Sequence, residues 1–177
     1  MRVIAGDAKG KRLRAPTGAG TRPLTDRVKE AIFSSLGEEV VGARVLDLFA
    51  GSGAFGLEAL SRGASVVLFV EKSRQALTAL RANISKVGLG GEVAACTVTE
   101  YLASTDERFD LVFVDAPWDL AVGEVLASSV ARMVAGGTLI LSRRRQDENP
   151  PTPSGLIVSA QKRYGDARIT WYDKETD

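Results

Sequence analysis

The sequence predicts an α/β fold with a mostly parallel β-sheet covered by helices on both faces. From Val45 to Ser142, short apolar runs alternate with segments in which apolar residues recur at helical spacing. The apolar runs are nearly continuous, which is typical of strands buried on both faces of a parallel sheet. A chain of 177 residues fits one domain and is long enough to bury a substantial core.

Composition excludes several classes of chemistry. The chain contains no histidine and a single cysteine, Cys96, so a zinc site, histidine general-base catalysis and a Ser-His triad are not expected. No apolar stretch approaches the length of a membrane span, and no N-terminal signal segment is evident. Because Cys96 has no partner for an intrachain disulfide, we expect a reducing, cytoplasmic location. The residue types predict no metal, and the lack of a long apolar stretch predicts no membrane partner.

The N-terminal segment combines a turn signal with positive charge. Two short runs, Arg2–Ala5 and Lys11–Arg14, flank the glycine-containing segment Gly6–Gly10, which predicts a β-hairpin. Residues 1–25 hold six basic side chains against the single acid Asp7, whereas the whole chain has a net charge of +1. This distribution favours a polyanion contact on one surface. A solvated charged hairpin with no partner is the alternative.

The first elements after this segment follow from caps and periodicity. Thr25 or Asp26 is a good N-cap for a helix with Val28, Ile32 and Leu36 on one face. The pattern then predicts, in order, a strand over Arg44–Leu48, a glycine loop, a helix over Gly56–Ser61 and a strand over Ser65–Val70.

The second half of the chain continues the alternation. Ser73 and Gly88 bound a helix, Gly88 being suited to its C-terminal end. Further strands are expected over Val93–Thr97, Phe109–Val114 and Thr138–Ser142, and a helix over Val122–Met133. After a charged, proline-rich loop at Arg143–Gly155, the runs Leu156–Lys162 and Arg168–Tyr172 predict an antiparallel pair that closes the sheet edge.

A glycine loop after the first strand indicates a nucleotide-type ligand. Gly51 to Gly56 satisfies the G-x-G-x-x-G pattern, and Glu71 stands about 20 residues on, where it can accept hydrogen bonds from both hydroxyls of a ribose. NAD and S-adenosylmethionine both have such a ribose. Asp47 favours S-adenosylmethionine, because a carboxylate there would repel a pyrophosphate and attract an ammonium or sulfonium group. A dinucleotide, or an Asp47 that only satisfies loop amides, stays open.

The tetrapeptide Asp115-Ala116-Pro117-Trp118 ends an apolar strand and has the groups needed to hold a planar base. The Asp115 carboxylate and the Ala116 carbonyl can accept the two hydrogens of an exocyclic amine, and orientation supplies much of the rate of a methyl transfer. Trp118 can stack on an unpaired or flipped base. Trp118 could instead fill the core. Nothing in the sequence indicates a raised pKa for Asp115, so the proton could equally leave to water.

Two basic segments are more ambiguous. The run Arg22–Arg27 could be an ordinary helix start, a phosphate contact or a wall of the donor pocket. The run Arg143–Arg145 follows a strand and could add a second basic edge, although a plain loop explains it as well.

At this point the chain resembles the RsmD family, the bacterial methyltransferases of guanine N2 in small-subunit ribosomal RNA. The similarity spans nearly the whole chain. It is carried by five segments, Arg2–Gly6, Gly10–Leu13, Arg22–Glu30, Asp47–Gly53 and Gly56–Ala59, together with Glu71 at a strand end. The segment Arg22–Glu30 is the most specific, because the glycine loop is shared by many methyltransferases.

The resemblance implies a Rossmann-like class I methyltransferase with a seven-stranded sheet, an RNA-contacting extension over residues 1–25 and a methyltransferase domain over 26–177. It implies a monomer that uses S-adenosyl-L-methionine, releases S-adenosyl-L-homocysteine and acts on 16S rRNA within a small-subunit particle. The donor would be held by Asp47, Phe49, Ala50, Gly51, Ser52, Gly53, Glu71, Lys72 and Val98. Guanine N2 would meet Asp115, Ala116, Pro117 and Trp118, and RNA would contact Lys9, Lys11, Arg12, Arg14 and Arg22.

The chain departs from the family at two positions. Ala116 stands where proline is usual, so the backbone is less restricted there. Leu24 stands where threonine is common. Two other functions stay open. One is the same chemistry on adenine N6 or a glutamine amide, because variants of the tetrapeptide serve these acceptors as well. The other is a non-catalytic RNA-binding assembly factor, of which Ala116 would be the first sign. An NAD-dependent oxidoreductase is a more distant third.

Overall fold

The computed structural model describes residues 1–17 and 25–176, and its elements follow the expected order. The helices are α1 (Asp26–Leu36), the 3₁₀ helix η1 (Gly37–Val40), α2 (Ala54–Ser61), α3 (Arg74–Val87), α4 (Val98–Ser104) and α5 (Gly123–Val130). The strands are β1 (Arg44–Leu48), β2 (Val66–Val70), β3 (Glu92–Ala94), β4 (Phe109–Val114), β5 (Met133–Arg144), β6 (Leu156–Tyr164) and β7 (Ala167–Lys174).

The strands form one seven-stranded sheet in the order β3-β2-β1-β4-β5-β7-β6. The first five are parallel, and β7 pairs antiparallel with both β5 and β6, which confirms the expected pair at the sheet edge. In the register of the central strands, Leu48 lies beside both Val70 and Val114. The residues that follow these three strands, Phe49, Glu71 and Asp115, are therefore brought to the same edge of the sheet.

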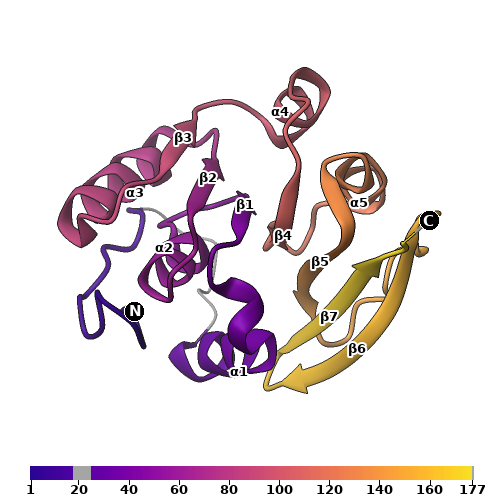
Figure 1. The fold of residues 1–177 in the computed structure, drawn as a ribbon, viewed down its shortest axis with the longest axis horizontal. Helices are drawn as coiled ribbons and strands as arrows, with labels where there is room; N and C mark the ends of the chain where they lie inside the picture. Colours follow the sequence, from indigo (N-terminus) through magenta and orange to yellow (C-terminus); the bar gives the residue numbers. More distant parts are fainter. Residues whose placement is uncertain (18–24, 177) are drawn as a thin grey trace.

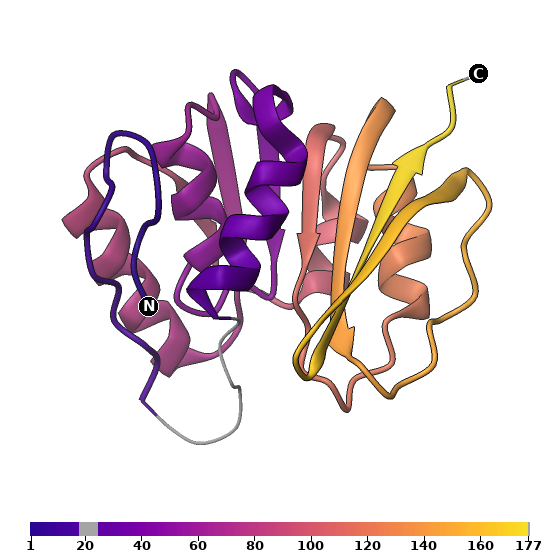
Figure 2. The ribbon, with the colours of Figure 1, turned by 90° about the horizontal axis from the view of Figure 1, so that it is seen from below.

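Helices cover both faces of the sheet, as the uninterrupted apolar strands predict (Figures 1 and 2). One core contains Ile32, Phe33 and Phe55 from α1 and α2, together with Phe113 of β4. The other core contains side chains of α4 and α5, packed on the opposite face of the same strands. Alternate residues of β1 supply the two cores, because successive side chains of a strand point to opposite faces.

The predicted caps are confirmed. The Thr25 side chain accepts a hydrogen bond from Val28 N at the start of α1. The Ser73 side chain accepts one from Ala76 N at the start of α3, and Gly88 ends that helix in a left-handed conformation with φ of 72°.

Most predicted boundaries agree within two residues, and the main differences lie in three regions. Instead of a strand over Val93–Thr97, β3 ends at Ala94 and Thr97 caps the unexpected helix α4 through a reciprocal capping box with Glu100. The helix expected to reach Met133 ends at Val130, because Met133 begins β5 beside Phe109. Strand β5 also continues to Arg144, a residue expected in a loop, because β7 pairs with it as far as Ala167.

The N-terminal segment forms a small hairpin that lies against α2 and α3, on the opposite side of the molecule from β6 and β7 (Figures 1 and 2). Arg2 and Arg12 form an antiparallel bridge, and Val3 N donates to Lys11 O at 3.0 Å. The expected hairpin is present, but in the described residues it has a single β-bridge in place of two paired strands. In the described part of the chain, no helix is long and apolar enough to cross a membrane.

Candidate functional site

A cavity of about 1090 Å³ opens at the carboxyl edge of β1, β2 and β4, where the predicted site residues converge. Its lining includes eleven of those residues: Phe49, Ala50, Gly51, Ser52, Glu71, Lys72, Val98, Asp115, Ala116, Pro117 and Trp118. Two predicted donor-site residues, Asp47 and Gly53, do not border the cavity. The structure thus brings the glycine loop and the tetrapeptide after β4 together in one hollow.

The glycine loop owes its shape to backbone conformations that favour glycine. Gly51 and Gly53 have φ values of 57° and 80°. Phe49 also has a positive φ, 59°, which is uncommon for a bulky residue. A Cβ atom on Gly53 would lie 2.5 Å from Leu80 Cδ1, so Gly53 lets α2 start close to α3. Its contribution to the site is this close packing.

Asp47 lies beneath the loop and supports the start of α2. It is 1% exposed, and its Oδ2 accepts a hydrogen bond of 2.9 Å from Gly56 N. Burial raises the pKa of Asp47 well above its ordinary value, the Gly56 hydrogen bond lowers it, and the charges of Asp115 and Glu71 raise it further. The alternative role weighed for Asp47, satisfying a loop amide, is therefore present in the structure.

Glu71 holds the glycine loop against the end of β2. Its Oε2 accepts from Gly51 N at 2.9 Å, and its Oε1 accepts from Lys72 N and Ser73 N, both at 2.8 Å. One carboxylate thereby orders two loops that border the cavity. A ribose that met Glu71 would meet a carboxylate already fixed in orientation.

Asp115 lies where β4 opens into the same cavity, and its environment was not evident from the sequence. Burial raises its pKa from 3.8 to about 6. The Ser142 hydroxyl lies near Asp115 and lowers its pKa. Its oxygen is buried and has no hydrogen-bond partner of good geometry among the described residues. The carboxylate is thus a stronger base than an exposed aspartate, a property that nothing in the sequence indicated.

Trp118 borders the cavity and does not fill the core. Its ring carries the guanidinium of Arg144 at 5.1 Å from the ring centroid, a cation–π contact that orients the indole. Arg144, which the sequence left between a basic edge and a plain loop, thus lines the site. Along the described ranges 1–17 and 25–176, no donor is directed at the Ala116 carbonyl, which leaves that oxygen free to accept a hydrogen bond.

The N-terminal segment forms a further wall of the cavity that sequence reasoning missed. Met1 and the segment Ala15–Thr17 line it, and so does the buried Lys29 of α1. Lys29 pairs with the fully buried Glu58 at 3.2 Å. Burial lowers the pKa of Lys29, and Glu58 partly offsets that effect. No local sequence signal marks these wall residues, because their position depends on long-range packing.

Glu58 anchors the hairpin to the domain. Its two carboxylate oxygens accept hydrogen bonds from Ile4 N at 2.8 Å and Ala5 N at 3.0 Å. It also pairs with Arg62 at 2.8 Å, in addition to Lys29. The hairpin is thus fixed to α2 by a buried carboxylate and is not a free arm.

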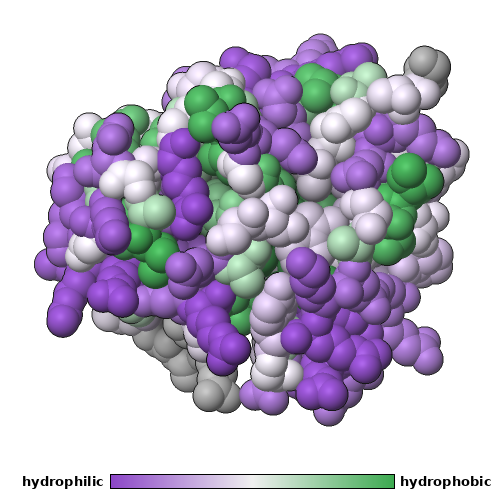
Figure 3. Space-filling view, turned by 60° about the horizontal axis from the view of Figure 1, so that its bottom comes forward, coloured by the Kyte–Doolittle hydropathy of each residue, from purple (hydrophilic) through white to green (hydrophobic). Residues whose placement is uncertain are grey.

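The predicted RNA-contacting residues differ in their surroundings. Lys9, Arg12 and Arg14 are exposed on the hairpin. Lys11 is also exposed, but its ammonium group donates to the carbonyls of Lys86 and Val87 at the end of α3. Arg22 lies outside the described residues. Figure 3 shows mostly polar side chains over the face turned to the viewer, with apolar side chains in small separate patches.

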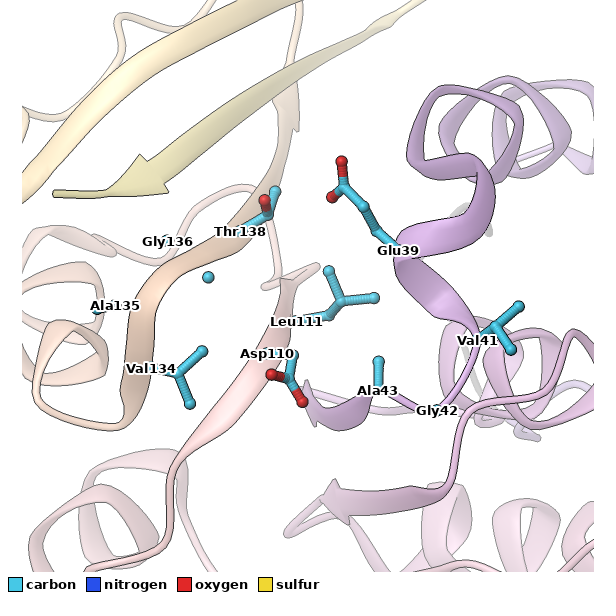
Figure 4. A pocket seen from close by; sticks show the side chains of 11 residues that line it. Glu39, Val41, Gly42, Ala43, Asp110, Leu111, Val134, Ala135, Gly136 and Thr138 are labelled. Atoms are coloured by element: carbon cyan, nitrogen blue, oxygen red, sulfur yellow. The ribbon is translucent and has the colours of Figure 1, made fainter. Parts of the chain in front are cut away.

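A second cavity, of about 340 Å³, lies at the opposite end of the sheet (Figure 4). Its titratable lining side chains are Glu39 and Asp110, and Asp110 already accepts a hydrogen bond from Arg44 N at 2.8 Å. The described residues contain no group of three potential metal ligands. The larger cavity is therefore the candidate active site.

Comparisons with known proteins identify the family to which the chain belongs. The model of a family described as conserved hypothetical protein 95 matches residues 1–173. The Escherichia coli K12 protein "Ribosomal RNA small subunit methyltransferase D" is 40% identical over 179 residues, which cover 99% of this chain and 90% of that protein.

Two solved structures extend the comparison. The Escherichia coli protein yhhF, assigned as a methyltransferase, has a TM-score of 0.89 at 30% identity and covers 100% of this chain and 99% of its own. SMU.776, assigned as a methyltransferase and complexed with SAH, has a TM-score of 0.68 at 12% identity over 79% of this chain and 48% of its own, a similarity of fold. The chain belongs to the conserved hypothetical protein 95 family, the family of ribosomal RNA small subunit methyltransferase D, and has the Rossmann-like class I methyltransferase fold.

Proposed function

We propose that this protein transfers the methyl group of S-adenosyl-L-methionine to the exocyclic N2 of one guanine in 16S ribosomal RNA, releasing S-adenosyl-L-homocysteine. The observation that carries the proposal is the shared cavity. Its lining includes the glycine loop and Glu71 together with Asp115 and Trp118, so that a donor and an acceptor base can meet within one hollow. Membership of the methyltransferase D family supports the choice of ribosomal RNA.

The cavity fits the proposed donor in its chemistry. Glu71, which faces the cavity with both oxygens oriented by backbone amides, would hold the ribose hydroxyls. Phe49 and the run Ala50–Ser52 would surround the methionine part, with Gly53 shaping the loop and Asp47 acting from below it. Lys72 and Val98 would border the ribose and adenine. When bound, S-adenosyl-L-methionine supplies an electrophilic methyl group on a sulfonium.

The acceptor side of the site would hold the amine and the ring of guanine separately. The Asp115 carboxylate and the free Ala116 carbonyl would accept the two hydrogens of N2, and this orients the nitrogen lone pair toward the methyl group. Pro117 would restrict the turn and Trp118 would stack on the base. With a pKa of about 6, Asp115 is mostly ionised near neutral pH and can take up the proton that N2 loses.

RNA would reach this site along the hairpin side. Lys9, Arg12, Arg14 and Arg22 would contact phosphates. The ammonium group of Lys11 would contact RNA in addition to the two helix carbonyls to which it donates. In this account residues 1–25 are the RNA-contacting extension and 26–177 the catalytic domain. The protein works in the cytoplasm as a monomer on a small-subunit particle.

A substrate panel tests the proposal. Purified protein and labelled S-adenosyl-L-methionine would be incubated in parallel with naked 16S RNA, small subunits from cells lacking this protein, and duplex DNA. Label in the RNA of the small subunits supports the proposal. Label in DNA or in protein would instead support an adenine or glutamine acceptor, and donor binding without transfer to any substrate would support a non-catalytic assembly factor.

A further inference from the structure

We infer that Arg143 of strand β5 is a positioning residue that fixes the acceptor loop, residues 115–120, which follows β4. The inference rests on the proposed function for its catalytic consequence and on the contacts of the free protein for its structural part. Arg143 does not border the cavity. It acts on residues 117–120, which do border the cavity.

The guanidinium of Arg143 donates hydrogen bonds to three backbone carbonyls of the loop after β4. Nη2 donates to Trp118 O at 2.8 Å, and Nη1 donates to Leu120 O at 2.9 Å and to Pro117 O at 3.4 Å. Pro117 O also accepts from Leu120 N at 3.0 Å, which closes a turn over these residues. A single side chain thus defines the path of the loop immediately after Asp115 and Ala116.

The Arg143 side chain is buried, and the contact with the loop is partly buried. Arg143 is 9% exposed, and its ionic partner Asp147 lies 3.8 Å away. Three carbonyl dipoles that point toward one partly buried spot repel each other and are costly without a donor. A guanidinium meets this need because it is planar, permanently charged and has five donors in a fixed fork. A lysine in its place retains the charge but has no such fork.

Arg143 is itself held rigidly. It lies within β5, where it pairs with Arg168 of β7, and β7 is covered on its other side by β6. The residues on either side act on the same tetrapeptide: Ser142 lies near Asp115, and Arg144 covers the Trp118 ring. Three successive residues of one strand therefore influence the pKa of the carboxylate, the path of the backbone and the orientation of the ring in the acceptor loop.

The arrangement leaves free the acceptors that the reaction needs. Arg143 takes the carbonyls of Pro117, Trp118 and Leu120, whereas the Ala116 carbonyl receives no donor from the described residues. Fixing the carbonyls of Pro117, Trp118 and Leu120 also orients the Ala116 carbonyl, because all of them belong to one continuous turn. Loss of the fork would let Ala116 and Trp118 move relative to the methyl donor, while the donor loop on the other side of the cavity would be undisturbed.

The test compares Arg143→Lys and Arg143→Gln with Arg145→Gln. Arg145 is two residues away, exposed and without a side-chain contact in the described structure, so its variant controls for lost charge at this edge. For each protein, the single-turnover methylation rate on small subunits, its pH profile and the dissociation constant of S-adenosyl-L-methionine would be measured. A Trp171→Phe background would leave Trp118 as the sole tryptophan, and acrylamide quenching of its fluorescence would report the loop without any substrate.

We expect Arg143→Lys to lower the plateau rate by about 10- to 100-fold, the scale of a small misplacement of reacting groups. The donor dissociation constant and the midpoint of the pH profile should not change, since Arg143 is not among the causes of the Asp115 pKa. Quenching of Trp118 should increase in both Arg143 variants and not in Arg145→Gln. If Arg143→Gln does not fold, the lysine variant carries the test, because it keeps the buried charge beside Asp147.

Two results would overturn the inference. One is a methylation rate in Arg143→Lys equal to that of Arg145→Gln, and the other is Trp118 quenching unchanged in the Arg143 variants. If the unaltered protein methylates no substrate, the proposed function fails. The quenching measurement then still decides whether Arg143 fixes the loop.

Discussion

The buried side-chain amide of Asn83 donates a hydrogen bond of 2.9 Å to the carbonyl of Ser52, in the middle of the glycine loop. The same amide nitrogen donates to Arg14 O at 2.9 Å, and the amide oxygen accepts from Arg14 N at 2.8 Å. One residue of α3 therefore joins the loop that would hold the methyl donor to the segment that would meet RNA. The two halves of the site are physically linked through Asn83.

Replacing Asn83 by alanine should weaken both halves at once. The change leaves the Arg14 amide and the carbonyls of Arg14 and Ser52 without partners, at a cost of about 1–3 kcal/mol in the free energy of unfolding. Donor affinity should fall as well, because the glycine loop loses a support. Urea unfolding and donor titration measure the two effects, with the exposed Ser85→Ala on the same helix as control. Unchanged donor affinity would show that the link has no role in donor binding.

Methylation should depend on pH through Asp115. Its pKa of about 6 means that the carboxylate, the better acceptor for N2, is lost as pH falls through 6. The single-turnover rate should rise across this range and level off above it, and Asp115→Asn should be slow at every pH with no such rise. A flat profile for the unaltered protein would separate Asp115 from the rate-determining step.

The raised pKa of Asp115 makes the folded protein less stable as pH rises, whereas it makes methylation faster. The folded protein binds a proton at Asp115 more tightly than the unfolded chain does, so the contribution of Asp115 to stability is fully present below pH 3.8 and is lost as pH rises through about 6. Relative to the unaltered protein, Asp115→Asn should therefore increase the free energy of unfolding more at pH 7 than at pH 4. Urea unfolding at the two pH values measures the difference, and equal effects at both would contradict the assignment.

Glu71→Gln should weaken binding of S-adenosyl-L-methionine. Glutamine has one acceptor oxygen where Glu71 offers two to Gly51 N, Lys72 N and Ser73 N, and a hydrogen bond to a charged group is worth about 1.5–3 kcal/mol. Calorimetric titration would measure the loss. Glu124→Gln removes the same charge from another wall of the cavity and serves as the matched control. An equal loss in both variants would indicate a general charge effect without specific recognition by Glu71.

RNA binding should depend on salt through the hairpin. Arg12→Gln should reduce the slope of log affinity against log salt by about 0.7–0.9, the contribution of one phosphate contact. Arg108→Gln removes an exposed arginine that immediately precedes β4, at the opposite end of the sheet, and should leave the slope unchanged. Filter binding of 16S RNA over a range of potassium chloride concentrations provides the slopes. Identical slopes for the two variants would remove Arg12 from the interface.

Local patterns were sufficient for the sheet and for most of the cavity. The ends of β1, β2 and β4 follow from where apolar runs stop, and the shared register then brings Gly51, Glu71 and Asp115 together. Helix α4 was missed because Val93–Thr97 looks like a strand, although the capping pair Thr97 and Glu100 was a signal that could have found it.

Features that depend on long-range packing could not be predicted. A run of three arginines after a strand looks like a solvated loop, yet pairing with β7 extends β5 and turns Arg143 inward to the acceptor loop. The raised pKa of Asp115 comes from burial, which no local pattern encodes. Lys11 illustrates the same limit, because its ammonium group has partners at the end of α3, a helix more than 60 residues away in the sequence.

The most direct test of the account identifies the methylated nucleoside. Small subunits from cells lacking this protein would be incubated with it and labelled S-adenosyl-L-methionine, and the digested RNA would be analysed by mass spectrometry, with Asp115→Ala as control. The account predicts N2-methylguanine at a single site, and no incorporation by the variant despite normal donor binding. N6-methyladenine, or incorporation that persists in Asp115→Ala, would contradict it.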